Sequence, residues 1–168
     1  MPRLFTRILV IALTFIVAGC ATEPTPIPLE LQYQQPSSSA SSATIIGSQE
    51  DSSWADDFTA FVIAVDGKRV MAGRKGWNKP LHLSPGNHHL DVEFNRGVFV
   101  ANAKLDLTAH AGGTYELKYS TDVAFNGANT YCDFWVVDTT TGKSVTDIVR
   151  GPVGGAQAAY VPIFLPAR

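Results

Sequence analysis

The sequence contains few of the residues from which enzyme and metal sites are commonly built. Only two cysteines, Cys20 and Cys132, occur among its 168 residues, so no paired-cysteine metal motif is present. A glycine-flanked nucleophilic serine and a His-Glu-x-x-His helix are also missing. These absences leave an enzymatic function without a candidate catalytic residue, and we expect a non-catalytic protein without a cofactor.

Long hydrophobic runs are equally scarce, and the one near the N-terminus is too short to span a bilayer. Residues Ile8 to Gly19 would form a helix of roughly 18 Å, whereas the hydrocarbon core of a membrane is about 30 Å thick. The run follows Arg3 and Arg7 and ends in small residues before Cys20. This pattern predicts a signal peptide over residues 1–19.

The end of that segment, Val17-Ala18-Gly19-Cys20, resembles the lipobox of bacterial lipoproteins. The resemblance implies that Cys20 is acylated, becomes the first residue of the mature chain and anchors it to a membrane. The next residues, Ala21 and Thr22, include no aspartate, which is similar to lipoproteins sorted to the outer membrane and facing the periplasm. The alternative is an ordinary secretory signal that ends in a cysteine by chance.

Removal of the signal peptide would change both the charge and the thiol content of the chain. Loss of Arg3 and Arg7 from the 13 basic residues leaves 11 against 15 acidic ones, a net charge of about −4. This balance disfavours a nucleic-acid partner. With Cys20 acylated, Cys132 has no partner for an intramolecular disulfide. Its place in an apolar run predicts a buried, inert thiol.

Composition divides the rest of the chain into three parts. Residues 20–42 are rich in proline and then in serine, which predicts a disordered linker some tens of Å long. Residues 43–149 are long enough for one domain. Residues 150–168 predict a C-terminal arm that docks on its own domain, engages a partner or stays free. The arm mixes small residues with Tyr160, Val161, Ile163, Phe164 and Leu165.

The domain is predicted to be all-β, with the strands arranged as a small antiparallel β-sandwich. Apolar residues alternate along its segments, turn residues interrupt them about every ten positions, and no helix is expected. Short strands that bury one face, with no helix to cover it, imply two sheets packed on each other. The clearest turn is Asp66-Gly67, a two-residue hairpin that would set Ile63 opposite Val70.

Two further turns predict how the following strands are aligned. A turn centred on residues 96 and 97 would set Phe94 against Phe99, and every neighbouring inward pair would then be apolar. A glycine-rich loop after that would set Asp106 against Lys118 as an exposed cross-strand ion pair. These pairings make a meander in which each strand lies beside its neighbours in the sequence.

Three stretches of the central region resemble the PEGA-type small β-sandwich domain and related domains of bacterial lipoproteins. They are Val65-Asp66-Gly67, Pro80-Leu81-His82-Leu83, and the run from Pro85 to Val92. The resemblance covers residues 58–119 in a single copy, and the Pro-Glu-Gly-Ala stretch itself is missing. It implies an immunoglobulin-like sandwich that serves as an envelope-exposed binding or spacing module, and it supplies no catalytic residues.

One stretch concentrates basic residues inside this acidic protein. The run could hold phosphate or carboxylate groups of an envelope protein, an anionic envelope polymer or a lipid surface, with the tryptophan stacking on the partner. The alternative is a solvated hairpin whose tryptophan folds back onto the core. The residues concerned are Lys68, Arg69, Arg74, Lys75, Trp77 and Lys79.

Histidines near the next turn form a weak metal-site candidate. If Pro85-Gly86 centres a hairpin, His82 and His89 lie opposite each other on the outer face, with Asp91 one pleat farther on. Imidazole and carboxylate groups are suitable ligands for zinc or copper. The alternative, which we favour, is a surface pair without a metal. In the same register His88 points inward against Leu105 as a partly buried core residue.

A stretch near the C-terminus imitates a phosphate-binding loop without meeting its requirements. Residues 139–144 end in Gly-Lys-Ser, but position 137 is valine where the motif needs glycine, and no helix follows. A threonine-rich hairpin turn is the better interpretation. The sequence therefore favours a lipid-anchored, non-catalytic envelope module that binds or spaces envelope components. The alternative is a lipoprotein that binds a small ligand or metal in a defined pocket.

Overall fold

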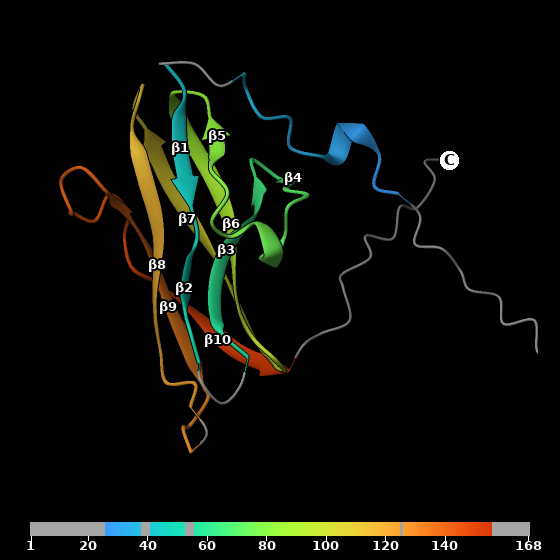
Figure 1. Ribbon diagram of the computed structural model, residues 1–168, viewed down its shortest axis with the longest axis vertical. Helices are drawn as coiled ribbons and strands as arrows, with labels where there is room; N and C mark the ends of the chain where they lie inside the picture. Colours follow the sequence, from blue (N-terminus) through green and yellow to red (C-terminus); the bar gives the residue numbers. More distant parts are fainter. Residues whose placement is uncertain (1–25, 38–40, 53–55, 125, 156–168) are drawn as a thin grey trace, which may run out of the picture.

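The computed structural model describes residues 26–37, 41–52, 56–124 and 126–155, and these residues form an all-β domain (Figure 1). Two single turns of 3-10 helix, η1 (Leu29–Leu31) and η2 (Arg74–Gly76), are the helical elements of the described part. The all-β prediction is thus confirmed. The strands are β1 (Ala43–Ile46), β2 (Ser48–Glu50), β3 (Phe58–Val65), β4 (Lys68–Arg69), β5 (Leu81–Leu83), β6 (Gly86–Arg96), β7 (Phe99–Ala109), β8 (Thr114–Thr121), β9 (Tyr131–Asp138) and β10 (Val149–Gly155).

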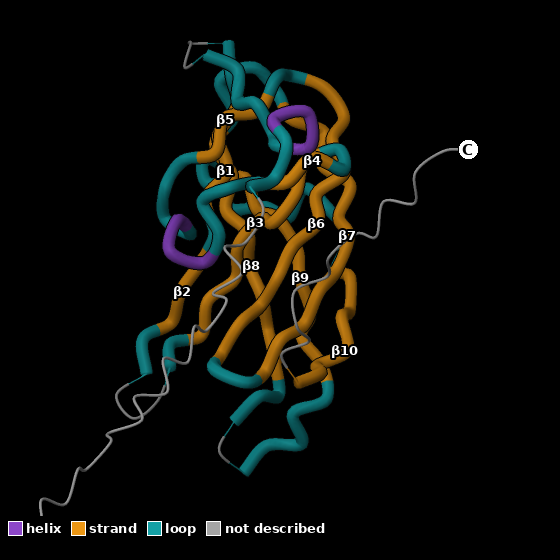
Figure 2. Tube along the Cα trace, turned by 90° about the vertical axis from the view of Figure 1, so that its right-hand side faces the viewer, coloured by secondary structure: helices purple, strands orange, loops and turns teal. Residues whose placement is uncertain are grey.

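The strands follow one another in a single curled sheet. Their order is β2-β3-β6-β7-β10-β9-β8-β1-β5, and β4 pairs with β3 beside this path. The expectation of a purely antiparallel sheet is wrong, because β1 runs parallel to β8. The strands form one continuous sheet that bends into a half-barrel (Figures 1 and 2), and the core lies between its two facing halves.

Two glycines lie where a strand passes from one half of the curl to the other. Gly47 joins β1 to β2, and a Cβ atom there would lie 2.2 Å from the carbonyl oxygen of Ala60. Gly151 lies in β10, and a Cβ atom there would lie 2.4 Å from the carbonyl oxygen of Asn102. β10 pairs with β9 through Pro152 and with β7 from Val153 onward, as it crosses the lower end of Figure 1. Backbones approach closely at both corners because neither residue has a side chain.

The core is built from alternate residues, as the period-two pattern predicts. Along β6, Leu90, Val92 and Phe94 are fully buried. The ring of Phe94 lies 6.1 Å from that of Phe58 and 5.3 Å from that of Tyr119, so strands from both halves of the curl meet there. The other large, fully buried side chains are Ile45, Val65, Leu83, Leu105, Leu107, Leu117, Phe134 and Val136.

The first predicted hairpin is confirmed. Asp66 and Gly67 both have positive φ, 51° and 75°, and Val65 pairs with Lys68 across a two-residue turn. This backbone twist matches that of the flanking strands, and Asp-Gly adopts it readily. The amide of Val70 then donates to the carbonyl of Ile63 at 2.8 Å, which is the predicted register.

The next hairpin forms, but its register differs from the prediction. Arg96 pairs with Phe99, so Phe94 faces Ala101 instead of Phe99. The displacement is two residues along one strand, which leaves every side chain on its predicted face. Hydrophobic alternation determines which face of the sheet each side chain occupies, but it does not distinguish registers that differ by two residues. The geometry of the turn decides between those registers.

The hairpin predicted after β7 does not form, and the meander is broken there. β8 pairs with β9 and with β1, whereas β7 pairs with β6 and β10. The predicted ion pair between Asp106 and Lys118 is therefore wrong. Lys118 instead contacts Glu116 at 2.6 Å, and Asp106 contacts the ring of His89. The connection crosses from one half of the curl to the other, which a pattern of local alternation cannot reveal.

The boundaries of the domain also differ from those expected. Residues 150–155, placed by the sequence at the start of a C-terminal arm, belong to β10, a strand in the middle of the sheet. At the other end, three residues of the expected linker contact the sheet: Gln32 and Tyr33 contact β4, and Tyr33 and Gln35 contact β5. The predicted signal peptide, Cys20 and the arm beyond residue 155 lie outside the described residues.

Candidate functional site

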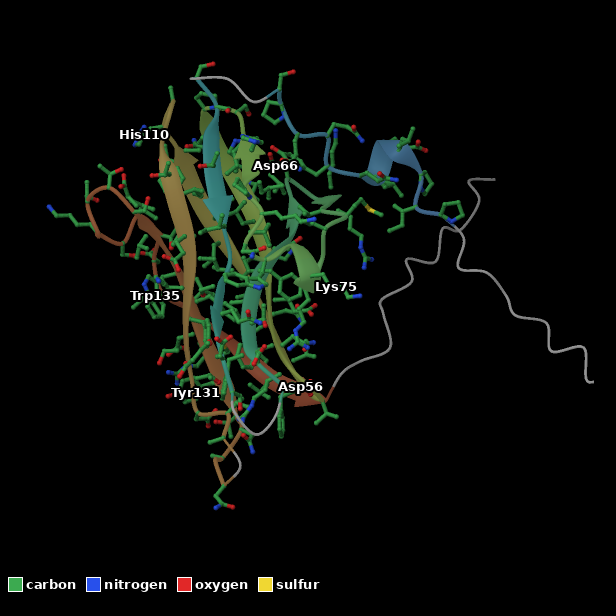
Figure 3. All side chains as sticks on the ribbon, in the orientation of Figure 1. Asp56, Asp66, Lys75, His110, Tyr131 and Trp135 are labelled. Carbon is green, nitrogen blue, oxygen red and sulfur yellow. The ribbon has the colours of Figure 1, made fainter. Side chains whose placement is uncertain are left out.

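The predicted basic run lies on one side of the domain, in β4, η2 and the loops around them. Lys68, Arg69, Lys75 and Lys79 are exposed, and we call these four residues the basic face. Lys75 points away from the sheet on the side where β4 and η1 lie (Figure 3). No carboxylate of the described chain lies in ion-pair contact with any of the four side chains. Four cations are therefore available to an anionic partner.

Arg74 belongs to the same run in the sequence, but its guanidinium group is bound within the domain. It donates to Asn95 Oδ1 and to the carbonyl of Asp57, both at 2.9 Å, and Nε lies 3.4 Å from Thr59 Oγ1. These bonds fix η2 against β3 and β6. Each of the three guanidinium nitrogens thus has one acceptor within the domain, which gives Arg74 a structural role, while its predicted role in partner binding stays a prediction.

The charge of Arg74 also acts on a nearby carboxyl. Burial raises the pKa of the Glu93 side chain above its ordinary value. A hydrogen bond with Asn95 and the charges of Arg69 and Arg74 offset that rise only in part. Glu93 is therefore harder to ionise than an exposed carboxyl, although the charges of Arg69 and Arg74 favour its ionised form.

The loop that carries these residues encloses a small cavity. Its volume is about 210 Å³, and its walls include Ile46, Phe61, Val70 and Trp77. Ligand pockets for drug-sized molecules are usually about 300–1,000 Å³, so this cavity fits only a small group. Trp77 lines it and is partly buried, while its carbonyl accepts a 2.6 Å hydrogen bond from Gly47.

The N-terminal segment from residue 27 to residue 35, here called the strap, crosses this side of the domain. The amide of Tyr33 donates to the carbonyl of Arg69 at 2.8 Å, beside a parallel bridge between Gln32 and Arg69. The Tyr33 hydroxyl donates to the carbonyl of His82 at 3.0 Å, and Gln35 Oε1 accepts from the amide of His82 at 2.9 Å. The strap therefore satisfies backbone groups of two edge strands, which are otherwise open to pairing with other chains.

The predicted metal candidates are not brought together. His82 lies in β5, which pairs with β1 and not with β6, so it does not face His89. His89 contacts Asp106, and Asp91 lies 3.6 Å from Lys104. Among the described residues, no group of three histidine, cysteine or acidic side chains could hold a metal ion. The predicted Pro85-Gly86 hairpin does not form, because β5 pairs with β1, a strand distant in the sequence, and not with β6.

The structure brings together a series of hydrogen-bonded polar groups that the sequence did not predict. His88 is buried, as predicted, although it lies opposite Leu107 and not Leu105. Its Nδ1 lies 2.7 Å from Asp66 Oδ2, and the amide of His89 donates to Asp66 Oδ1 at 2.9 Å. These contacts tie the β3–β4 turn to β6. The inward position of His88 was the one signal in the sequence that could have indicated a buried partner.

Ser84 completes this chain, and its composition matches that of a Ser-His-Asp triad. The Nε2 atom of His88 lies 2.8 Å from the backbone carbonyl of Ser84 but 3.4 Å from its hydroxyl. In a triad the imidazole nitrogen must accept the hydroxyl proton directly. Because the shorter contact is to a carbonyl, which accepts and cannot donate, the geometry favours a structural latch over an activated nucleophile.

The pKa of Asp66 is consistent with such a latch. Partial burial acts to raise it, but the hydrogen bonds from the His89 amide and the His88 ring, with the charges of both histidines, bring the net pKa below its ordinary value. The ionised carboxylate is thus the form that the folded protein favours.

Two other sequence predictions concern inert or turn residues, and both are confirmed. Cys132 is fully buried, and burial, reinforced by Asp133, raises the pKa of its thiol. Residues 139–144 form a turn after β9, in which Asp138 Oδ1 accepts from the amides of Thr140 and Thr141. A bridge between Val137 and Ser144 closes that turn.

Comparison with known proteins gives no further guide to the site. The chain matches no known protein family, no curated protein and no solved structure. Within the described residues there is also no helix with the length and apolar character needed to cross a bilayer.

Proposed function

We propose that this protein is a lipid-anchored, non-catalytic module of the bacterial cell envelope that binds or spaces other envelope components. The observation that carries the proposal is the basic face, four exposed cations without ion-pair partners in the described part of an acidic chain. The anchor is supported by the lipobox-like run that ends in Cys20. The partner is an envelope protein or an anionic envelope polymer.

The proposal also covers the type of β-domain and the membrane in which the protein is anchored. A PEGA-like or immunoglobulin-like sandwich is supported by the Asp66-Gly67 hairpin and by a core that lies between two facing halves of the sheet. Location at the outer membrane, facing the periplasm, is supported by Ala21 and Thr22 after the lipobox.

Lipid attachment can be tested directly. Cells that express the protein are fed an alkyne-tagged palmitate, and the purified protein is analysed by mass spectrometry of its N-terminal peptide. We expect a diacylglyceryl and acyl group on Cys20 and none in Cys20→Ala. An unmodified Cys20 in a secreted product would overturn the anchor and leave an ordinary secretory signal.

Partner binding requires a substitution that leaves the fold intact. Charge reversal at Arg74 would break its internal hydrogen bonds, so Lys68→Glu with Lys75→Glu is the cleaner variant. A photo-crosslinking residue placed at Lys79 should capture an envelope component in cells, and the double variant should lose it. Lys104→Glu with Lys143→Glu makes the same charge change outside the basic face and is the matched control. Equal capture by both variants would show that the basic face does not bind.

A small-ligand function is the second candidate, and the cavity beside Trp77 favours it. Native mass spectrometry of protein purified in mild detergent tests this directly. A bound small molecule, absent from a Val70→Phe variant that fills the cavity, would support a ligand-binding lipoprotein. A bare protein mass would support the binding or spacing module.

A further inference from the structure

We infer that the strap and the basic face together form a surface that rests on the anionic bilayer in which the protein is anchored. The inference goes beyond the proposed binding of an envelope protein or polymer, because it adds lipid headgroups as a second partner of the same surface, and it rests on the proposed acylation of Cys20. It is carried by the docking of the strap, the side chains exposed around it and the length of chain between the strap and the anchor.

Docking of the strap shortens the tether, which is the part of the chain between Cys20 and the first residue of the strap. Six residues lie between Cys20 and Ile27, where the strap begins, so their Cα atoms are seven residue steps apart. Fully extended, the tether reaches about 24 Å, whereas a free linker as far as Ser42 would reach about 75 Å. The hydrogen bonds of Tyr33 and Gln35 with Arg69 and His82 fix the strap to the domain. The side of the domain that bears the strap is therefore held close to the membrane surface.

That side presents exposed apolar and cationic residues together. Leu29 on η1 is 71% exposed and Met71, just after β4, is 56% exposed. Lys68 and Arg69 lie in β4, whose edge is bridged to the strap. Apolar side chains among cations are the combination by which surfaces bind the headgroup region of anionic membranes.

Few acidic residues oppose the positive charge of the basic face on η1, β4 and the turn before β4. Glu30 is the exposed carboxylate of η1. Asp66, in the turn before β4, accepts hydrogen bonds from His88 and His89 and is turned toward β6. The four cations of the basic face thus outnumber the three acidic residues of the tether, η1 and the turn before β4 (Glu23, Glu30 and Asp66), which leaves these segments with net positive charge.

The arrangement in space agrees with this orientation. In Figure 2, η1, η2 and β4 all lie on the side facing the viewer, with β8 and β9 behind them. The loop that connects β9 to β10, which contains Thr140, projects from the opposite side in Figure 1. A protein resting on the strap side would therefore keep this loop away from the bilayer.

The test measures which side of the anchored protein contacts lipid. The full-length protein, processed by cells and purified in detergent, is reconstituted in phosphatidylglycerol vesicles that carry nitroxide-labelled headgroups. A fluorophore is attached in one sample at Met71→Cys and in the other at Thr140→Cys. Cys132 is fully buried and does not compete for the label. We expect strong quenching at position 71 and little at position 140.

Charge variants then test the cause of the orientation. Each cation near an anionic surface strengthens binding about five-fold, so Lys68→Gln with Lys75→Gln should lower the ratio of membrane-facing to free orientations about 30-fold. Quenching at position 71 should fall accordingly, as it should in neutral phosphatidylcholine vesicles. Lys104→Gln with Lys143→Gln should leave it unchanged. Equal quenching at positions 71 and 140, or no effect of the Lys68 and Lys75 changes, would overturn the inference.

Flotation with neutral vesicles separates this inference from the proposed anchor. A protein that floats but shows no selective quenching at position 71 keeps its anchor and loses the membrane-facing surface. A protein that fails to float has no working anchor. In that case, selective quenching on phosphatidylglycerol vesicles would still support the surface, and its absence would overturn the surface as well.

Discussion

Gly47 joins β1 to β2 at a point where no side chain fits, so Gly47→Ala should weaken the fold more than its small size suggests. A Cβ atom there would lie 2.2 Å from the carbonyl oxygen of Ala60 and 3.1 Å from that of Trp77. A close carbon–oxygen contact is about 3.3 Å, so the strands would have to separate by about 1 Å. The obstructing atoms belong to the backbone and cannot rotate away.

The size of the effect follows from three contributions. Forcing extra atoms into a packed site costs about 1–3 kcal/mol. The separation also weakens the 2.6 Å hydrogen bond from the Gly47 amide to the Trp77 carbonyl, whose loss costs about 1 kcal/mol. Alanine restricts the unfolded chain and returns about 0.4–1 kcal/mol. The net loss in the free energy of unfolding is therefore about 2 kcal/mol, a large part of the 5–15 kcal/mol of a typical domain.

Urea unfolding of the purified protein, followed by circular dichroism, measures this loss. With a slope of about 1–3 kcal/mol per molar urea, the midpoint should fall by about 1 M. Gly154→Ala is the matched control, because a Cβ atom at that position meets no atom within 4 Å. Its midpoint should stay level or rise slightly. Equal midpoints for the two variants would refute the conclusion that the close approach at Gly47 shapes the fold.

Three further predictions concern Arg74, the latch formed by Asp66 and His88, and the buried thiol. Arg74→Met should lower the free energy of unfolding by about 2 kcal/mol, because charged hydrogen bonds are lost, whereas Lys75→Met should change it by less than about 0.5 kcal/mol. Thermal melts compare the two variants, and similar melting temperatures would contradict the structural role of Arg74. The lowered pKa of Asp66 means that its stabilising effect is fully present above the unfolded pKa of about 3.9 and is lost as the pH falls through the folded value. The stability advantage of the natural protein over Asp66→Asn should therefore shrink in acid, and a constant difference between pH 6 and pH 2 would argue against it. Cys132 should resist a thiol reagent at pH 8 in the native protein and react in urea, as read by peptide mapping; rapid native labelling would show that the site opens.

Some features of the fold could be read from short stretches of sequence. The turn at Asp66-Gly67 was predictable because its two residues suit positive φ. The buried faces of β6 and β7 were predictable because alternation alone decides them. The inward position of His88 followed from the same alternation, as did the burial of Cys132 in its apolar run. Each of these properties depends on residues within a few positions of one another.

The candidate site could be predicted only as a list of residues. The basic run is continuous in the sequence, but nothing there separates Arg74, which is bound by Asn95 and Asp57, from Lys75, which is exposed. The partner of His88 was also hidden, since Asp66 precedes it by 22 residues and lies in another hairpin. Proline and serine content predicted a free linker, and the contacts of Tyr33 and Gln35 with the sheet overrode that preference.

By itself the sequence determined an all-β domain, its clearest hairpin and the side chains that form its core, because alternation and turn chemistry act locally. The tertiary structure alone decided that β1 pairs with β8 and β5, that β10 joins the two halves of the curl, and that the strap lies beside the basic face. These outcomes depend on backbone hydrogen bonds and close approaches between segments far apart in the chain, at Gly47 and Gly151 above all. Such contacts leave no periodic pattern in the sequence, since any strand with the right alternation can serve as the neighbour.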